Sequence, residues 1–328
     1  MRIIRGFTKP YALFDYRTTM KCSFSGQTDP GLVRTTNQDA FVVGEQEYPF
    51  FVVADGMGGH AGGEEASHLA STTVKERLVS EWTTSTASRD MLHRAVLAAN
   101  EAILTDQVAH PERADMGTTL VTAVYRQRQW WFAHVGDSRL YRIRNKQVEQ
   151  ITEDHTWVAR AVKMGELTDD QARNHPWRHV LMQCLGREEC HHIDISVMDV
   201  QQGDWLLLCS DGLTEELSDT AIADCLRAAS DLDDAVERLV AGAKARGGRD
   251  NITVVLVSVD QLSPEEIDPL PEPAPLLMAE VLEQEGGDDE DMGLMGAESV
   301  DVEDDAEDTE PMDLDVTSPY GEGVELVE

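Results

Sequence analysis

The amino-acid sequence predicts an α+β domain built mainly from antiparallel sheets, and three observations support this class. Strand-like apolar runs come first, helical patterns follow, and further strand-like runs come after them. Short polar turns join neighbouring strand-like runs in two places, which is typical of antiparallel hairpins. The pattern also lacks the regular alternation of strand and helix that builds a parallel sheet.

The first half of this pattern centres on one buried strand. Residues 50–54 form a continuous apolar run rich in β-branched and aromatic side chains, which predicts a strand buried on both faces. A shorter strand is expected before it, at residues 40–44. Helices are expected after it, at residues 64–82 and 88–108, because apolar side chains recur there every three or four positions.

The second half returns to strands. Hairpins are expected at residues 120–135 and 140–151, where polar residues separate apolar arms. Residues 154–186 break this rhythm with a capping box from Thr168 to Gln171, and we interpret them as an insertion. The remaining expected elements are strands at residues 193–200, 205–209 and 252–259, and helices that begin near residues 220 and 233.

Charge divides the chain unevenly. The 328 residues carry a formal net charge of −35, and residues 261–328 contain 24 Asp and Glu but no Lys or Arg, so −11 remains for residues 1–260. This acidic segment has too few large apolar side chains to offset the entropy of ordering, so we expect a disordered tail. Residues 22–260 are the expected folded domain, preceded by residues 1–21 as a lead-in segment without clear periodicity.

The composition argues against several partners. An acidic body repels phosphate backbones and anionic lipid surfaces, so we expect neither nucleic-acid nor membrane binding. The five cysteines are odd in number and scattered, which fits a reducing compartment. There is no apolar leader and no long apolar run, and we therefore expect a cytoplasmic protein. We take it to be a monomer.

Four aspartates stand at the ends of apolar strand-like runs: Asp55, Asp137, Asp211 and Asp250. Strand ends meet at the rim of a sheet, so these carboxylates could converge there. Close carboxylates repel one another unless protons or cations intervene, and a pair of divalent ions is the usual resolution. The Gly56 carbonyl could add a further oxygen ligand. For any single aspartate, an ordinary turn after a strand is the alternative.

Seven short pieces of the sequence occur in the order found in one enzyme family. They are VRTTNQD (33–39), VADGMGG (53–59), MGTT (116–119), VGDSR (135–139), DHT (154–156), SDGL (210–213) and DN (250–251). Through them, residues 22–260 resemble the bacterial metal-dependent protein phosphatases, also called the PPM family or type 2C serine/threonine phosphatases. The resemblance implies a central antiparallel β-sandwich flanked by helices on both sides, with Mg²⁺ or Mn²⁺ in a cleft at one edge.

The resemblance also assigns roles to the acidic residues. Asp55 would bridge two ions, the Gly56 carbonyl would bind beside it, and Asp211 and Asp250 would complete this inner site. Asp137 together with Asp211 would hold a third ion. The reaction implied is direct attack on phosphorus by a water that bridges the two inner ions.

Residues beside the ligands have implied roles as well. Arg34 matches the arginine that binds the substrate phosphate, although by residue type alone it would be a solvated loop charge. Asp39 and Asn251 would contact the metal ligands rather than the ions themselves. Gln38 stands where many members have a glutamate that reaches the metal through water. Met57 stands where eukaryotic members have a histidine proposed as general acid, so the identity of that acid is open here.

The implied function is hydrolysis of phosphoserine and phosphothreonine in proteins, opposing a serine/threonine kinase. One alternative is a catalytically weak, phosphatase-like scaffold that binds phosphoprotein, which the complete set of aspartates opposes. Another is a nuclease with two metals, which the acidic body opposes. Residues 154–186 match the position of a flap beside the active site. The tail could bind a basic partner, or it could be only a solubilising appendage.

Overall fold

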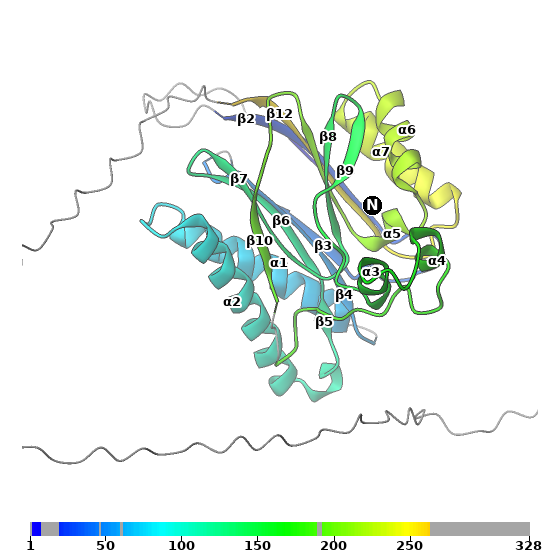
Figure 1. Ribbon diagram of the computed structural model, residues 1–328. Helices are drawn as coiled ribbons and strands as arrows, with labels where there is room; N and C mark the ends of the chain where they lie inside the picture. Colours follow the sequence, from blue (N-terminus) through cyan, green and yellow to red (C-terminus); the bar gives the residue numbers. More distant parts are fainter. Residues whose placement is uncertain (1, 8–19, 46, 60–61, 189–191, 263–328) are drawn as a thin grey trace, which may run out of the picture. The chain divides into compact units, whose positions relative to one another are not determined.

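The computed structural model describes residues 2–7, 20–45, 47–59, 62–188 and 192–262. Within them, two antiparallel sheets face each other, and helices cover the outer side of each sheet (Figure 1). This arrangement confirms the α+β class and the helix-flanked sandwich. The folded unit lies within Met1–Ile267, and the acidic segment expected to be a disordered tail lies outside the described residues from position 263 onward.

The strands pair in two sheets. The first sheet has the order β1-β2-β12-β11-β8-β9, and the second has the order β10-β7-β6-β4-β3, with β5 paired to β4 beside it. The bounds in the first sheet are β1 Arg2–Phe7, β2 Lys21–Asp29, β8 Arg139–Arg144, β9 Gln147–Gln150, β11 Trp205–Cys209 and β12 Ile252–Gln261. Those in the second are β3 Asp39–Val43, β4 Phe50–Met57, β5 Gly117–Thr118, β6 Leu120–Arg126, β7 Gln129–Val135 and β10 Asp194–Met198.

Helices form the outer layers of the sandwich. The long helices α1 (Gly62–Glu81) and α2 (Ser88–Ala109) cover the second sheet, and a 3₁₀ turn follows at Pro111–Arg113. The helices α6 (Asp219–Ala228) and α7 (Leu232–Ala245) cover the first sheet, after the short α5 (Asp211–Thr214). No helix among the described residues is both long and apolar enough to cross a membrane.

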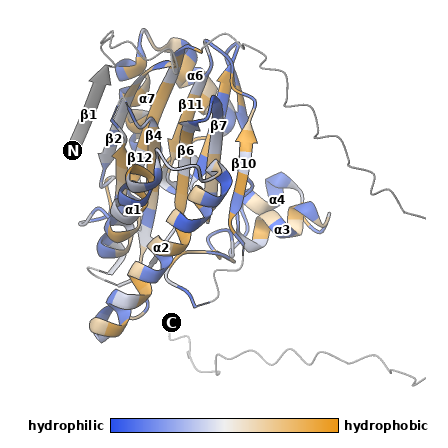
Figure 2. Ribbon diagram, turned by 90° about the vertical axis from the view of Figure 1, so that its left-hand side faces the viewer, coloured by the Kyte–Doolittle hydropathy of each residue, from blue (hydrophilic) through white to orange (hydrophobic). Residues whose placement is uncertain are grey.

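The central apolar strand is buried on both faces, as predicted. Along β4, Phe50, Val52 and Ala54 pack into the core beneath α1 and α2, whereas Phe51 and Val53 pack into the core between the sheets. Strands β11 and β12 alternate in the same way between the inter-sheet core and the core beneath α6 and α7, and Figure 2 shows their apolar character. Because these strands fill two close-packed cores, they cannot slide without repacking both, and the residues at their ends are held in place.

Both predicted hairpins are present, and each has a two-residue turn. Gln127 and Arg128 in the first turn, and Asn145 and Lys146 in the second, have φ values between 52° and 65°. Two successive residues with positive φ are the signature of the type I′ turn, whose twist matches that of the flanking strands. The turns therefore fix the register of β6 with β7 and of β8 with β9.

The N-terminal part of the fold differs from the sequence expectations. The lead-in segment at residues 1–21 contains β1, which pairs antiparallel with β2. The sequence pattern does not indicate β2 either, because polar residues such as Ser25 and Gln27 occupy buried positions in it. Ser25 donates a hydrogen bond to Asp233 at 2.7 Å, so a polar contact holds β2 where an apolar pattern would have been detected.

The insertion at residues 154–186 contains α3 (Trp157–Lys163) and α4 (Asp169–Arg173) and lies beside the sandwich (Figures 1 and 2). The capping box that starts α4 at Thr168 is confirmed. One isolated bridge, between Thr156 and Leu181, joins the two ends of the insertion to each other, and a second, between Thr118 and Leu185, joins it to the rest of the fold. Since Thr118 belongs to β5, which pairs with the end of β4, the insertion is attached to the edge at which the central strand ends.

Candidate active site

The structure brings the predicted strand-end aspartates together. Asp55 lies near the end of β4, Asp137 follows β7, and Asp211 starts α5 directly after β11. The carboxyl groups of Asp55 and Asp211 lie close enough to shift each other's pKa. The charge of Asp137 acts on Asp55, and that of Asp250, just before β12, acts on Asp211. All four predicted aspartates therefore belong to one site.

Asp39 adds a further acidic group to this site. It lies directly opposite Asp55 in the pairing of β3 with β4, and its Oδ2 accepts a hydrogen bond from Ser210 at 2.7 Å. Asp39 thus stands behind Asp55 and beside Asp211, which agrees with the supporting position expected from the sequence. We refer to Asp39, Asp55, Asp137 and Asp211 as the aspartate cluster.

The environment of the aspartate cluster favours protonated carboxyl groups. Burial is the largest cause for each member, and repulsion from neighbouring carboxylates adds to it. The pKa values of Asp39 and Asp211 rise to about 7, and the pKa values of Asp55 and Asp137 rise well above the ordinary value. Without bound cations, the cluster therefore relieves its repulsion by taking up protons.

Thr119 fixes two of these strand ends relative to each other. Its N–H donates to the Asp55 carbonyl at 2.9 Å, and its hydroxyl accepts from the Asp55 N–H at 3.0 Å. The same hydroxyl bonds that of Ser138 at 2.7 Å, one residue after Asp137. Thr119 and Ser138 are both fully buried, so this contact sets the spacing between the backbone at Asp55 and the backbone at Asp137.

Glycine is required after two of the aspartates. A Cβ atom on Gly56 would lie 1.9 Å from the Gly63 carbonyl oxygen, and one on Gly212 would lie 2.0 Å from the Asn251 carbonyl oxygen. No side chain fits such distances, so glycine allows the backbone to pass this closely. Backbone carbonyl groups, including that of Gly56, can therefore lie beside the carboxylates.

Asn251 holds the loop that carries Arg34. Its Oδ1 accepts a hydrogen bond from the Gln38 N–H at 2.7 Å. Its Nδ2 donates to the carbonyl oxygens of Pro30 and Thr36, at 3.1 and 2.9 Å. One amide side chain thus binds the loop at three points on both sides of Arg34. This explains why an asparagine follows Asp250: it positions the loop next to the cluster.

Arg34 itself reaches the cluster edge. Its NH2 group donates to Asp250 Oδ2 at 2.7 Å, and about half of its side chain remains exposed. The structure therefore brings the predicted phosphate-binding arginine to a predicted metal ligand. Gln38 lies nearby and donates from its Nε2 to the Gly58 carbonyl at 3.1 Å, so its amide bonds the glycine turn after β4.

The insertion is bonded to the backbone around Asp137. The Gly136 carbonyl accepts from the His155 N–H at 2.8 Å, and the Gly136 N–H donates to His155 Nδ1 at 3.2 Å. Arg139 donates to both carboxylate oxygens of Asp154, at 2.6 to 3.0 Å. These contacts hold the start of the insertion beside Asp137.

A cleft of about 1060 Å³ extends from Asp137 and Asp211 along α3 and α4. Its lining includes Glu215, which sequence reasoning did not single out. Glu215 lies one helical turn after Asp211, and its N–H donates to the Asp211 carbonyl at 2.8 Å. The spacing of four residues could have indicated this neighbour. His179, whose Nδ1 contacts Glu215 Oε1 at 2.5 Å, has no comparable signal in the sequence.

The donor set fits hard divalent cations. Oxygen atoms dominate it, and the buried Oδ1 atoms of Asp39 and Asp211 have no hydrogen-bond partner among the described residues. The two arginines near the cluster are engaged, Arg34 with Asp250 and Arg139 with Asp154. The aspartate cluster is therefore short of positive charge, and Mg²⁺ or Mn²⁺ could supply it.

Comparison with known proteins agrees with this geometry. Residues 33–256 match the family described as protein phosphatase 2C. The chain is 37% identical over 243 residues to the serine/threonine phosphatase stp of Listeria monocytogenes, covering 71% of this chain and 94% of that one. It is 36% identical over 238 residues to the protein phosphatase PhpP of Streptococcus pneumoniae, covering 71% and 96%.

Solved structures give the same result. The serine/threonine phosphatase PstP/Ppp of Mycobacterium tuberculosis aligns with a TM-score of 0.66 and 33% identity, covering 74% of this chain and all of that one. The catalytic domain of PstP in complex with two manganese ions aligns with a TM-score of 0.64 and 32% identity, with the same coverage. The chain therefore belongs to the protein phosphatase 2C family, and it is a metal-dependent protein phosphatase of the PPM type, which uses Mn²⁺ or Mg²⁺.

Proposed function

We propose that this phosphatase hydrolyses phosphoserine and phosphothreonine in proteins by direct attack of water on phosphorus. The observation that carries the proposal is a buried aspartate cluster that is short of positive charge, with a half-exposed arginine at its edge. When bound, two Mn²⁺ or Mg²⁺ ions lower the pKa of a water that bridges them and offset charge on the phosphoryl oxygens. The reaction needs no cysteine nucleophile, and burial raises the pKa of the Cys209 thiol to about 12.

The residues proposed to hold the two ions are Asp55, the Gly56 carbonyl, Asp211 and Asp250. Asp137 with Asp211 is proposed to hold a third ion. The supporting residues act through the backbone: Thr119 spaces the strand ends, and Asn251 holds the loop that carries Arg34. Two further residues lie next to the proposed ligands. Gln38 bonds the glycine turn after β4, and Asp39 is paired with Asp55 between β3 and β4.

Arg34 is proposed to bind the substrate phosphate. Its guanidinium group pairs with Asp250 at 2.7 Å. If Asp250 binds a cation, its contact with Arg34 is weakened. The guanidinium group of Arg34 can then bind the phosphoryl oxygens, whose geometry it matches. The substrate's neighbouring residues would lie along the cleft beside α3 and α4.

The physiological substrates are proposed to be proteins phosphorylated by a serine/threonine kinase. We further propose that residues 22–260 form the catalytic domain, with residues 154–186 as its flap. The acidic residues 261–328 would recruit a basic partner, because a polyanion attracts cationic surfaces over the screening length of the solution. The active form is proposed to be a monomer.

The test is hydrolysis of a phosphothreonine peptide by the purified full-length chain. We expect release of phosphate with Mn²⁺ or Mg²⁺ and none in excess chelator, and turnover should return when the metal is added back. Turnover that persists in excess chelator would exclude the two-metal reaction. Absence of turnover with every divalent ion, from a protein that binds Mn²⁺, would instead favour the binding scaffold.

A further inference from the structure

The proposed reaction, on which the following inference rests, leaves one chemical task unassigned. When the bond between phosphorus and the seryl or threonyl oxygen breaks, the departing alkoxide must receive a proton. Met57 cannot supply one, because a thioether carries no acidic hydrogen. A general acid at the edge of the cluster, within reach of an incoming phosphoprotein, would perform this task.

His179 in the flap occupies such a place. Its Nδ1 lies 2.5 Å from Glu215 Oε1, and one ligand atom each of His179, Asp211 and Glu215 lie within 4.8 Å of one another. The His179 side chain is 48% exposed, whereas that of Glu215 is 18% exposed. The imidazole is therefore held on its inner side by a carboxylate and remains open to solvent on its outer side.

Glu215 is fixed by the same backbone that positions the cluster. It caps the C-terminal end of α5, and its N–H bonds the carbonyl of Asp211 at 2.8 Å. Its carboxylate engages Nδ1 of His179, so Nε2 is the ring nitrogen available to a second partner. A carboxylate that orients an imidazole in this way also stabilises its protonated form.

The charges that face His179 come from several elements. Burial, the largest effect, lowers the pKa of His179. Arg178 in the flap and Arg249 before β12 lower it further, and Asp250 raises it. Burial likewise raises the pKa of Glu215, and Arg178 and Arg249 counteract this. These opposing charges surround the contact between His179 and Glu215, and Glu215, Arg178 and Arg249 belong to the lining of the cleft.

We propose that His179 is the general acid of this phosphatase, oriented by Glu215. Nδ1–H donates to the Glu215 carboxylate, and Nε2–H passes its proton to the serine or threonine oxygen as the bond from that oxygen to phosphorus breaks. Water forms the new bond to phosphorus and gives up one proton to solvent, so the products are inorganic phosphate and the free hydroxyl group of the serine or threonine residue. The neutral imidazole regains its proton from solvent, to which its side chain is open.

The leaving group distinguishes this role from a structural one. Nitrophenolate is a stable anion and departs without protonation, whereas the alkoxide of threonine does not. In the His179→Gln variant, with saturating Mn²⁺, we expect kcat for a phosphothreonine peptide to fall by about 10²-fold. We expect kcat for p-nitrophenyl phosphate to stay close to that of wild type.

Two further variants complete the design. His175→Gln changes another flap histidine, which stacks on Trp157 with ring centroids 5.1 Å apart, and should leave both reactions unchanged. Glu215→Gln keeps a similar shape but removes the orienting charge, and should slow only the peptide reaction, by less than His179→Gln does. Thermal unfolding and Mn²⁺ calorimetry should match wild type for His179→Gln.

Equal losses on both substrates would overturn the proposal, because a flap that is merely disordered slows every reaction. A weakened Mn²⁺ isotherm in His179→Gln would also overturn it, since His179 would then be a metal ligand with Asp211 and Glu215. If wild type hydrolyses neither substrate with Mn²⁺, the proposed function itself fails. Wild-type turnover of both substrates, with no selective loss in His179→Gln, rejects the general acid alone.

Discussion

Two groups of acidic side chains in this phosphatase differ in how their charge is balanced. In the aspartate cluster, burial and mutual repulsion raise the pKa values, and no arginine among the described residues pairs with its four members. The second group, Asp199 and Asp204 with Arg142 and Arg144, lies at the β8–β9 hairpin, and we call it the balanced group. There the pKa of Asp199 is lowered, chiefly by its hydrogen bond with Arg144.

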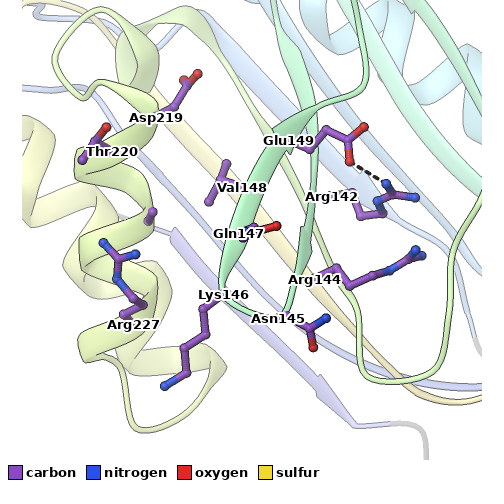
Figure 3. A pocket seen from close by; sticks show the side chains of 11 residues that line it. Arg142, Arg144, Asn145, Lys146, Gln147, Val148, Glu149, Asp219, Thr220 and Arg227 are labelled. Carbon is purple, nitrogen blue, oxygen red and sulfur yellow. Dashed lines mark hydrogen bonds and ion pairs between the residues drawn. The ribbon is translucent and has the colours of Figure 1, made fainter.

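The geometry of the balanced group is that of a completed ion-pair network. Arg144 donates through Nε and NH2 to the two carboxylate oxygens of Asp204, at 2.9 and 2.8 Å. Arg142 and Arg144 both contact Asp199, at 3.1 and 3.0 Å. Figure 3 shows the two arginines beside a cavity of about 600 Å³ between the hairpin and α6, where Arg142 also pairs with Glu149.

This difference in charge balance distinguishes a catalytic group of acidic residues from a structural one. Both groups sit beside a cavity, and both contain acidic residues next to strands, so neither cavity nor composition distinguishes them. Charge balance does: the carboxylates at the hairpin have arginine partners, whereas the aspartate cluster needs cations from outside the protein. We therefore expect changes in the cluster to affect catalysis and changes in the balanced group to affect stability.

The largest effect should come from Asp55→Asn. Loss of the proposed bridging carboxylate should reduce turnover by about 10³-fold or more, because two-metal catalysis supplies several kcal/mol. Without metal, the variant should be at least as stable as wild type, since one repelling carboxyl group is gone. Steady-state kinetics and thermal unfolding in chelator measure both. Turnover within tenfold of wild type would place the catalytic ions elsewhere.

The converse change is Asp204→Ala in the balanced group. It should lower the free energy of unfolding by about 2 kcal/mol, because the buried Asp204 carboxylate no longer accepts hydrogen bonds from Arg144. The Gln201 N–H, which donates to Asp204 at 2.7 Å, is left unpaired as well. Turnover of the folded variant should equal that of wild type. Urea unfolding and kinetics check the two statements, and a loss of kcat without a loss of stability would contradict the comparison.

Arg34→Ala tests the arginine at the edge of the aspartate cluster. Removing a charge-assisted contact with phosphate should cost about 2 kcal/mol, seen mainly as a KM raised by roughly 30-fold. The fall in kcat should be smaller, because the contact exists in ground and transition states alike. Mn²⁺ affinity should hold or improve, since Asp250 loses a competing cation. Unchanged KM and kcat would show that Arg34 does not contact phosphate.

The smallest effect should come from removing the acidic segment. A chain that ends at Leu262 should keep the thermal midpoint and the turnover of a small aryl phosphate. Its activity on basic phosphopeptides should differ from that of the full chain only at low salt, because at about 0.15 M the Debye length is about 8 Å. If truncation unfolds the protein, the segment packs on the domain. Identical activity on all substrates at every salt concentration would leave it as an appendage.

Much of the fold could be predicted because its strands fill two apolar cores. The run at β4 and the turns at Asn145 and Gln127 have local signals, and all were confirmed. The strand β2 was missed because it is held by polar contacts such as that from Ser25 to Asp233, which only the tertiary structure brings together.

The candidate site also contains residues that could be predicted from the sequence and contacts that could not. Strand ends pointed to Asp55, Asp137, Asp211 and Asp250, and the family resemblance added Arg34, Gln38, Asp39 and Asn251, all of which the structure places in or beside one site. The pairing of Arg34 with Asp250 could not be predicted, because it joins residues 216 positions apart. The contact of His179 with Glu215 joins residues on separate elements and depends on how residues 154–186 pack beside α5, which no local sequence signal reveals.

The central claim is that the aspartate cluster exchanges protons for divalent cations, and proton release on Mn²⁺ binding tests it directly. The pKa values of Asp39 and Asp211 are raised to about 7, so both are largely protonated at lower pH in the metal-free protein. Bound cations require ionised ligands, so calorimetry in buffers of different ionisation enthalpy should show release of at least about one proton per protein near pH 6. Release should diminish as the pH rises above about 7, as the carboxyl groups ionise without metal. Mn²⁺ binding near pH 6 without proton release would contradict the account.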